Sequence, residues 1–533
     1  MEKQNILIGG AWPYANNLLH LGHIAGLISG DILARYYRLK GENVLYVSGT
    51  DCHGTPITER AKKEGRTPKE ISDYYDNEFR KTFLKMGFSY DLYTKTSTEY
   101  HSIEVQKIFK RIYDNGYIYE KVEPQAFCNK CNKFLSDREI RITCNRCGNI
   151  TKADQCEVCE YIPTVRDLEN GLCLECGTNT IQKDNKNLYF ALSKFQKILE
   201  EHVNKVNNIW RLNAKNETNK YLKEGLLDRA VTRDLDWGID IPITGYKNKK
   251  MYVWIEAVLG YITASKKWCE ENNQNFEQYW KNGNNNKIYM VHGKDNINFH
   301  SIILNALLKG LEDNYHLVDV IVSTEYLNIN DEKISKSKGN GITAIDMVEQ
   351  YNPDSLRYHI INNGPEKKDT NFSIDNFIST HNNEILNKFG NLVNRTLRFK
   401  GLEKIEIAEL DEQVSLEIDK IYNVIGKLIE KLEFKEATDS VMQFVEYSNK
   451  YYDIRQPWIQ KKENIKEFNN TIFTCATIIA NLSNLFEPFM PFCCNKIRQY
   501  FKIEKPTWDK IELNKEILLN NIEPLFERVD NNK

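Results

Sequence analysis

The sequence predicts an α/β protein in which a parallel, doubly wound sheet is split by a cysteine-rich insertion and followed by a bundle of helices. Three observations predict this architecture. Short apolar strands alternate with amphipathic helices up to about residue 115, and the alternation returns near residue 250. Eight of the 13 cysteines lie in one segment between these halves, and long amphipathic helices fill residues 381–503. A chain of 533 residues is also too long for one core, so we expect three or four domains.

The first half of the sheet follows from the pattern of apolar residues. Residues 5–10 and 43–49 are buried strands, and residues 21–39 are a helix that ends before Gly41. The segment "TPITERAKKEG" begins another helix, with Pro56 in its first turn. Because parallel strands need long crossover connections, this strand–helix order predicts a parallel sheet.

Three further strands are expected near and after residue 250, in the segments "MYVWIEA", "KIYMVHG" and "VDVIVST". No strand is expected after the segment "KISKSKGN" (333–340). The helical bundle is predicted from apolar residues at helical spacing. One such series is Ile418, Ile421, Ile425, Leu428 and Leu432.

Composition and charge limit the possible classes of protein. No apolar run approaches the ~20 residues that a membrane span needs. The apolar stretch at the N-terminus is too short for a signal peptide, so we expect a cytoplasmic protein. The net charge of −2 gives no general basicity, so any contact with RNA depends on local patches.

Four Cys-x2-Cys pairs dominate the insertion. Two such pairs close a tetrahedral site of four thiolates around one zinc ion, so four pairs predict two structural zinc sites. Free buried thiols or disulfides are the alternatives, and the cytosolic context disfavours disulfides. The nearly symmetric spacing indicates nesting, with the two middle pairs inside and the first and last pairs outside. The eight residues are Cys128, Cys131, Cys144, Cys147, Cys156, Cys159, Cys173 and Cys176.

Two polar motifs stand at the two ends, along the chain, of the split α/β domain. His20, Gly22 and His23 come where the first strand gives way to a helix, and a helix N-terminus favours phosphate. We expect both imidazoles to lie on one face of that helix. Lys333 and Lys336 belong to a cationic, phosphate-sized loop after the last strand. Taken alone, the first motif is most simply two surface histidines and the second a solvated turn. Taken together, the two motifs predict a nucleotide site.

At this point the sequence resembles the class I aminoacyl-tRNA synthetases, and in detail the methionyl-tRNA synthetase family. "HLGH" and "KISKS" match the two class signatures. "AWPYANNLLHLGH", "GTDCHGTPI", "YVWIEAVLGY", "GKDNINFH", "KISKSKGN" and "GNLVNR" follow in the family's order over almost the whole chain, and the cysteine pairs and helical C-terminal part match as well. The resemblance implies a Rossmann-like catalytic domain and an anticodon-binding bundle.

The resemblance implies roles for particular residues. Methionine would be bound by Trp12, Tyr14, Asp51, Trp254, Tyr261 and His300, with Asp51 on the ammonium group. ATP, accompanied by Mg²⁺, would be bound by His20, Gly22, His23, Gly293, Asp295, Lys333 and Lys336, of which the two histidines and two lysines would be catalytic. Without the resemblance, the aromatic residues are more simply core residues. Trp254 is expected on a strand, and Trp12 and Val258 depart from the family's bacterial pattern of leucine and proline.

The helical part carries the implied anticodon contacts, Asn391, Arg395 and Trp458. Trp458 follows Pro457, where a helix should break, so its indole is expected at a helix end where it can stack on an unpaired base. Without the resemblance, a core tryptophan is the simpler interpretation. The predicted domains are residues 1–115 and 235–345 (catalytic halves), 116–234 (insertion), 346–380 (stem-contact linker) and 381–533 (anticodon binding).

The implied partners are ATP, L-methionine and tRNA(Met), without a membrane. A monomer is expected because no appended tRNA-binding domain follows the bundle. Alternatives are a leucine- or cysteine-type synthetase, a small-molecule nucleotidyltransferase and a zinc-knuckle RNA-binding protein. The insertion leaves no room for a large editing domain, and neither of the last two needs every motif present.

Overall fold

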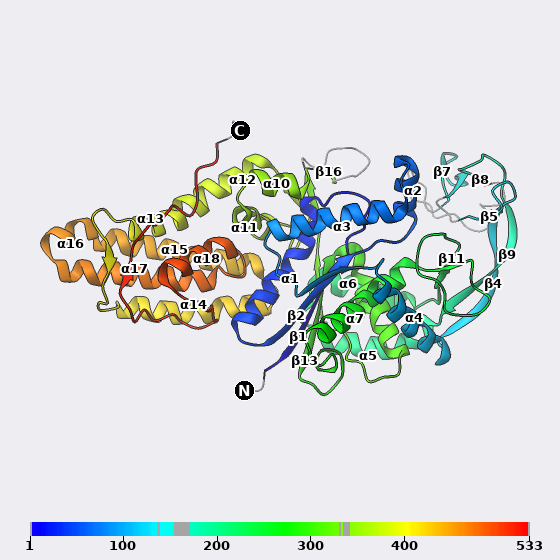
Figure 1. Cartoon of the computed structure of the whole chain (residues 1–533), viewed down its shortest axis with the longest axis horizontal. Coiled ribbons are helices and arrows are strands. Elements are labelled where there is room, and N and C mark those ends of the chain that lie inside the picture. Colours follow the sequence, from blue (N-terminus) through cyan, green and yellow to red (C-terminus); the bar gives the residue numbers. More distant parts are fainter. Residues whose placement is uncertain (1–2, 136–138, 154–170, 330–331, 334–341, 531–533) are drawn as a thin grey trace.

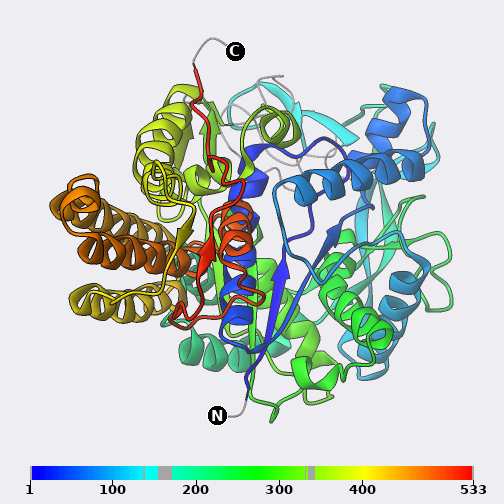
Figure 2. The same cartoon turned by 60° about the vertical axis from the view of Figure 1, so that its left-hand side comes forward.

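The computed structural model describes residues 3–135, 139–153, 171–329, 332–333 and 342–530, and of residues 332–333 only the backbone. The molecule is elongated, with the α/β part in the centre, the cysteine-rich insertion at one end and the helical bundle at the other (Figure 1). In Figure 2 the yellow and orange helices of the bundle lie to the left of the blue strands of the sheet. The predicted α/β architecture is confirmed.

A five-stranded parallel sheet in the order β14-β13-β1-β2-β3 forms the centre. Every residue of β1 is buried, because β1 lies between β13 and β2 and helices cover the sheet. The strands predicted at residues 5–10 and 43–49 and in "KIYMVHG" and "VDVIVST" are confirmed. Their bounds are β1 Asn5–Gly10, β2 Asn43–Thr50, β3 Leu92–Lys95, β13 Asn286–Gly293 and β14 Val320–Thr324.

Helices from the first half of the chain connect these strands. Helix α1 (Leu21–Leu39) spans the predicted range and packs on β1, β2 and β13. Helix α2 (Thr55–Glu64) has Pro56 in its first turn, as predicted. Helices α3 (Pro68–Lys85) and α4 (Glu99–Asp114) follow.

The strand predicted in "MYVWIEA" is wrong. Only Lys250–Met251 form a strand, β12, and helix α7 (Val253–Glu271) begins two residues later, so Trp254 lies on a helix. Helix α7 is buried around most of its circumference, between β2 and β3 on one side and α4 on the other. A short run of buried β-branched and aromatic residues has the same pattern in a buried helix as in a buried strand.

The insertion is built on a long antiparallel ribbon of β4 (Ile118–Cys128) and β9 (Ile181–Phe190). The ribbon extends away from the sheet and carries the short strands β5, β7 and β8 at its tip (Figure 1). The tip holds β5 Lys133–Phe134, β6 Ile140–Thr143, β7 Ile150–Lys152 and β8 Leu172–Cys173. Helices α5 (Gln196–Val206) and α6 (Leu212–Glu224) lead back to the sheet.

Strands do not stop at "KISKSKGN", contrary to the expectation. Strand β15 (Leu327–Ile329) pairs with β16 (Glu332–Lys333) and also, in parallel, with β17 (Thr370–Phe372). Two more short strands, β18 (Lys404–Ile405) and β19 (Ile517–Leu518), pair with each other. Segments of two or three residues are too short to show a period of two, which is why sequence pattern missed them.

The C-terminal part is a helical bundle, as predicted. Its helices are α12 Ile374–Thr380, α13 Asn391–Leu397, α14 Glu412–Glu430, α15 Phe434–Arg455, α16 Pro457–Glu463, α17 Ile465–Leu485 and α18 Pro491–Phe501, with a π-helix over His381–Gly390. The predicted break is confirmed, because Gln456 has a left-handed backbone (φ 49°) between α15 and α16.

A buried arginine joins helix α1 to the bundle. Arg357 of helix α11 (Pro353–Asn363) is fully buried and contacts the Asp31 carboxylate of α1 at 2.7 Å. The same guanidinium donates to the carbonyls of Pro488 and Phe489, just before α18. Helix α1, whose N-terminus carries the polar motif at residues 20–23, is therefore held against the bundle.

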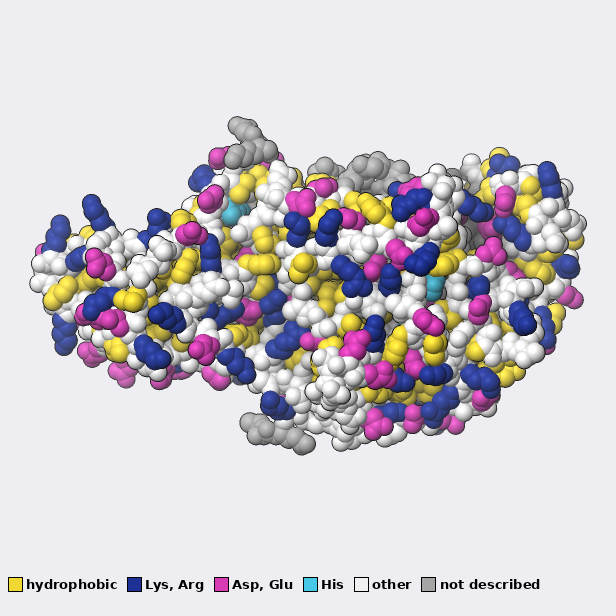
Figure 3. Space-filling model, viewed as in Figure 1, with side chains coloured by type: hydrophobic (Ala, Val, Ile, Leu, Met, Phe, Trp, Pro, Cys, Tyr) yellow, Lys and Arg dark blue, Asp and Glu magenta, His cyan; other side chains and the backbone are white. Residues whose placement is uncertain are grey.

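The surface is mixed in charge. On the face shown in Figure 3, lysine and arginine side chains lie among acidic ones along the length of the molecule, in keeping with the net charge of −2. Among the described residues, no helix is both long enough and apolar enough to span a membrane.

Candidate active site

A cavity of about 400 Å³ opens at the carboxyl ends of β1, β2, β13 and β14. This edge is where open parallel sheets bind their ligands. Eleven predicted residues line the cavity, some from the predicted ATP site and others from the predicted methionine site. They are Trp12, Tyr14, His20, Gly22, His23, Asp51, Trp254, Tyr261, Gly293, Asp295 and His300.

The two histidines stand at the N-terminus of α1, with ring centroids 3.8 Å apart. The expectation that both lie on one helical face is wrong for His20, which is the extended N-cap residue rather than part of the helix. The His20 Nδ1 accepts from the Gly22 N–H at 3.1 Å, and the His23 Nδ1 accepts from the His20 N–H at 3.1 Å. A ring nitrogen that accepts a hydrogen bond carries no proton, so the proton of each neutral ring is on Nε2.

Gly22 is required by this arrangement. A Cβ there would lie 3.0 Å from the His20 ring, so a larger residue would displace the imidazole. The site therefore combines two Nε2–H donors with the positive end of a helix dipole, which suits phosphate oxygens.

The structure describes only part of the second motif, which contains Lys333 and Lys336. The backbone of Lys333 lies in β16, paired with Asn328 of β15. Lys336 lies outside the described residues. Strand β15 begins at the cavity-lining residue Leu327, directly after Glu325 and Tyr326, so it starts at the edge of the cavity.

Tyr326 is a site residue that the sequence analysis missed. Its hydroxyl donates to the Asp295 carboxylate, and its ring lies 4.0 Å from the Lys294 ammonium. Lys294 in turn pairs with Glu325 at 2.6 Å and Asp369 at 2.8 Å. Tyr326 follows the carboxyl end of β14, and that position was the one signal in the sequence that could have found it.

Aromatic side chains form the other end of the cavity. The Trp254 indole N–H donates to the Tyr14 hydroxyl at 3.1 Å, and its ring meets Phe299 edge-on with centroids 4.0 Å apart. The Tyr261 hydroxyl bonds the His300 Nε2 at 2.8 Å. Although Trp254 is on a helix, it lines the cavity as predicted.

His300 is held as a neutral acceptor. Its Nδ1 donates to the Asn296 carbonyl at 2.8 Å, so its Nε2 accepts from Tyr261. Burial lowers the pKa of His300 to about 4, which keeps the ring uncharged at neutral pH. His292 stacks on it, with centroids 4.3 Å apart. This end of the cavity is therefore apolar and uncharged apart from Asp51.

Trp12 fills a slot made by two glycines. A Cβ at Gly260 of α7 would lie 2.7 Å from the indole, and one at Gly49 of β2 would lie closer still. Neither glycine belongs to a motif, because the distance of each from Trp12 depends on how α7 packs on the sheet. The departure from leucine at position 12 is thus accommodated by the absence of side chains opposite.

Asp51 is the charged group at the aromatic end. Its side chain follows β2 directly, and the residue is 3% exposed. Its backbone N–H donates to the Pro13 carbonyl at 2.9 Å, and Tyr14 pairs with it in an isolated parallel bridge. Burial and the nearby Glu256 carboxylate raise the pKa of Asp51 well above its usual value. A cationic group bound here would lower the pKa of Asp51 again.

The three predicted anticodon contacts lie together at the far end of the bundle. Trp458, in the first turn of α16, is 45% exposed, and its ring is 6.2 Å from that of Tyr452. The Arg395 guanidinium of α13 lies 3.8 Å from the Tyr452 ring and pairs with Asp453. Asn391, one turn before Arg395, is exposed. An exposed indole beside a stacked arginine offers a surface for planar bases.

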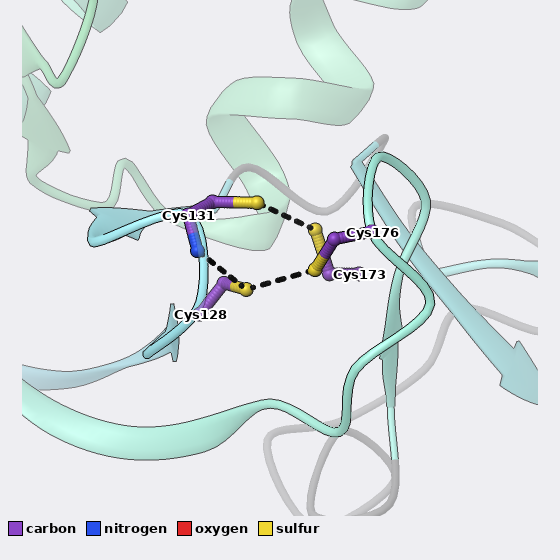
Figure 4. A group of neighbouring side chains, drawn as sticks. All are labelled: Cys128, Cys131, Cys173 and Cys176. Atoms are coloured by element: carbon purple, nitrogen blue, oxygen red, sulfur yellow. Dashed lines mark hydrogen bonds between the residues drawn. The ribbon is translucent and has the colours of Figure 1, made fainter.

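Four cysteines meet at the tip of the ribbon (Figure 4). Cys128 and Cys176 have sulfurs 3.4 Å apart, Cys131 and Cys173 have sulfurs 3.8 Å apart, and all four sulfurs lie within 4.8 Å of one another. Four sulfurs about 2.3 Å from a tetrahedral ion are about 3.8 Å apart, so the group can hold a metal ion.

These four cysteines form the outer of the two predicted sites. Of the predicted inner site, Cys144 and Cys147 are described, whereas Cys156 and Cys159 lie outside the described residues.

Comparison with known proteins shows the family. Residues 6–397 match the family model described as "tRNA synthetases class I (M)", and residues 411–530 match "Anticodon-binding domain of tRNA ligase". A methionine–tRNA ligase of Alkaliphilus oremlandii is 47% identical over 529 residues, which cover 99% of this chain and 97% of the relative. One of Bacillus mycoides is 46% identical over 533 residues, with the same coverage.

The fold is shared with a solved structure as well. Mycobacterium tuberculosis methionyl-tRNA synthetase in complex with methionyl-adenylate superposes with a TM-score of 0.81 at 21% identity. The likeness covers 98% of this chain and 100% of that one. The chain therefore belongs to the methionine–tRNA ligase family of the class I tRNA synthetases.

Proposed function

We propose that this chain joins methionine to tRNA(Met) in two steps. The methionine carboxylate attacks the α-phosphate of ATP, and pyrophosphate leaves as the methionyl-adenylate forms. The terminal adenosine of the tRNA then takes the aminoacyl group, and AMP leaves. One observation carries the proposal: a single cavity joins a phosphate-binding helix end to an aromatic pocket that contains one buried carboxylate.

The phosphate end acts by position and charge. We infer that the Nε2–H groups of His20 and His23 donate to phosphate oxygens, with Gly22 leaving room for the nucleotide. Gly293 and Asp295 line the nucleotide side. Lys333 and Lys336, with Mg²⁺, would neutralise the departing pyrophosphate. Reactions at phosphorus need little covalent help from the protein, and preorganised donors supply most of the acceleration.

The aromatic end selects the amino acid. We infer that Asp51 binds the ammonium group and that the aromatic set encloses the thioether. A sulfur–aromatic contact contributes only about 0.3–1.5 kcal/mol, which is roughly tenfold in affinity at most. The slot around Trp12 and the fixed Tyr261–His300 pair must therefore supply the remaining discrimination by shape.

One assay tests the proposal. ATP–pyrophosphate exchange is measured with each of the standard amino acids in turn. We expect that only methionine supports the exchange. Exchange driven by leucine or cysteine would reassign the substrate, and exchange without any amino acid would favour a nucleotidyltransferase.

Trp458→Ala tests the anticodon end. We expect the variant to charge tRNA about 10-fold to 100-fold less efficiently, because one stacked base contributes roughly 1–3 kcal/mol. Methionine-dependent pyrophosphate exchange, which uses no tRNA, should be unchanged. Ile459→Ala, at the next residue of α16, is the matched control. Equal damage to both reactions would instead assign Trp458 to folding.

The cysteine group is proposed to hold structural zinc. Cys173→Ser should lower the zinc content measured by atomic spectroscopy by one ion per chain, because three thiolates no longer close the tetrahedron. Cys269→Ser, at a buried cysteine of α7 far from the ribbon tip, is the control. A content of two ions in the native chain would support the second predicted site. An unchanged zinc content in Cys173→Ser would contradict the proposal that Cys128, Cys131, Cys173 and Cys176 hold zinc.

We also propose the domain division predicted above, with the catalytic part before residue 381 and the anticodon-binding part after it. The two family matches, over residues 6–397 and 411–530, support a division into two such parts. The cytoplasmic location and the monomeric state remain predictions of the sequence.

A further inference from the structure

A buried cluster of three titratable side chains lies directly behind the methionine pocket. Glu256, in the first turn of α7, is fully buried. One of its carboxylate oxygens contacts the His53 Nδ1 at 2.7 Å, and the other contacts the His101 Nε2 at 2.8 Å. The two histidines come from different elements, the loop after β2 and the first turn of α4, and are 5% and 2% exposed.

The hydrogen bonds around His101 determine its protonation. The Thr263 hydroxyl donates to the Gly260 carbonyl at 3.1 Å, so its oxygen is left to accept from the His101 Nδ1 at 2.8 Å. The Nε2 faces a carboxylate and must also carry a proton. His101 is therefore the cation that balances Glu256. A carboxylate this deeply buried needs such a partner, because desolvation strongly disfavours an unpaired charge.

The cluster is connected to the pocket through Asp51. The backbone N–H of His53 points to the Asp51 carboxylate at 3.4 Å, while its ring holds Glu256. Helix α7 continues from Glu256 to Tyr261 and Gly260, and Trp254 lies two residues before Glu256. Two carboxylates, those of Asp51 and Glu256, thus share one buried region beside a pocket that must receive a single ammonium group.

Two buried carboxylates in such proximity compete for charge. Burial alone would raise the pKa of Glu256, but the charge and hydrogen bonds of His53 and His101 outweigh it and lower that pKa. Among the described residues, two further titratable groups face Asp51: Tyr14, from the loop after β1, and Cys52, beside it in its own loop. Neither of these is a cation, so among these groups the balancing charge for Glu256 comes from His101.

We propose that His53, Glu256 and His101 are positioning residues for methionine. His101 balances the charge of Glu256 and His53 donates a hydrogen bond to its other oxygen, so that Asp51 is able to carry the negative charge that meets the substrate ammonium group. This inference rests on the proposed function and extends it, since it assigns the charge of the ammonium site to residues that do not touch the substrate.

The test uses the opposite effects of removing either charge. In His101→Gln, Glu256 loses its cation, so Asp51 must ionise beside an unbalanced carboxylate. In Glu256→Gln, that competing carboxylate is gone. The dissociation constant of methionine is measured by titration of the full chain as a function of pH. We expect the acid limb of the profile to move to higher pH in His101→Gln and to lower pH in Glu256→Gln.

A shift of one pH unit corresponds to about a tenfold change in affinity on the acid limb. His101→Gln should therefore bind methionine about tenfold more weakly below the limb and recover its affinity as the pH rises. Des-amino methionine, 4-(methylthio)butanoate, lacks the ammonium group, and its binding should show neither displacement. Glu270→Gln is the matched control, because Glu270 lies on the same helix and accepts a hydrogen bond from Tyr100, away from the pocket.

Shifts in the same direction for both variants, or a loss of affinity that is equal at every pH, would overturn the inference and leave the cluster a purely structural role. If His101→Gln does not fold, His53→Gln removes the hydrogen bond to the other Glu256 oxygen and should move the limb in the same direction. A native chain that does not activate methionine would contradict the proposed function itself, whereas normal activation without opposite shifts contradicts this inference alone.

Discussion

His23→Asn is expected to lower the rate of methionine-dependent pyrophosphate exchange by about 10²–10³, as for the loss of one preorganised donor to a developing charge. The structure separates the two nitrogens of this ring. Nδ1 accepts from the His20 N–H and completes the helix cap, and Nε2 carries the proton offered to phosphate. Asparagine places its oxygen near the position of Nδ1 and offers nothing at Nε2. Thermal stability should therefore change little.

His23→Gln is the companion variant, because the amide nitrogen of glutamine reaches the position of Nε2. We expect it to retain more activity than His23→Asn while losing the cap, which costs about 0.5–2 kcal/mol of stability. Exchange rates and unfolding midpoints of both variants are compared with the native chain. If both lose activity in proportion to their stability, the histidine is a structural cap and the phosphate role is wrong.

Asp51→Asn is expected to reduce kcat/KM for methionine by about 10²–10³, because removing one partner of a buried charge pair costs roughly 2–5 kcal/mol. Asparagine has the same shape, so the slot around Trp12 and the contact with Tyr14 should persist. The KM for ATP should be nearly unchanged, since Asp51 is at the amino-acid end of the cavity. A parallel rise in both KM values would indicate general distortion of the site.

The pH dependence gives a second check on Asp51. Burial and the Glu256 carboxylate raise the pKa of this carboxyl, and the substrate ammonium group needs its ionised form. Methionine affinity should therefore fall as the pH drops through the raised pKa and recover above it. Asp51→Asn has no proton to lose at this position, so its weak binding should not show that acid limb. An identical limb in the variant would assign the titration to another group.

Local sequence was sufficient for much of the framework. Residues 5–10, 21–39 and 43–49 were predicted as strand, helix and strand, and the structure confirms them because their apolar periods are long and uninterrupted. Four of the paired cysteines meet in one group, since their spacing already encodes a tetrahedral site. The break at Pro457 is likewise a property of the proline itself.

Other features depend on what lies opposite in space. The helix that carries Trp254 was predicted as a strand, because a helix buried on most sides has no polar face to reveal its period. Tyr326 carries no motif of its own and becomes a site residue only because β13 and β14 end side by side.

The sequence by itself determined the strands and the helix at residues 5–10, 21–39 and 43–49, the pairing of the outer cysteines and the place of the histidine motif at the edge of a parallel sheet, because these follow from spacing along the chain. Only the tertiary structure decided that Gly49 and Gly260 shape the slot for Trp12 and that Glu256 is contacted by two histidines from separate elements. Packing and electrostatic partners are set by distances across the fold, and residues more than 150 positions apart in the chain, such as His101 and Glu256, carry no mutual signal in the sequence.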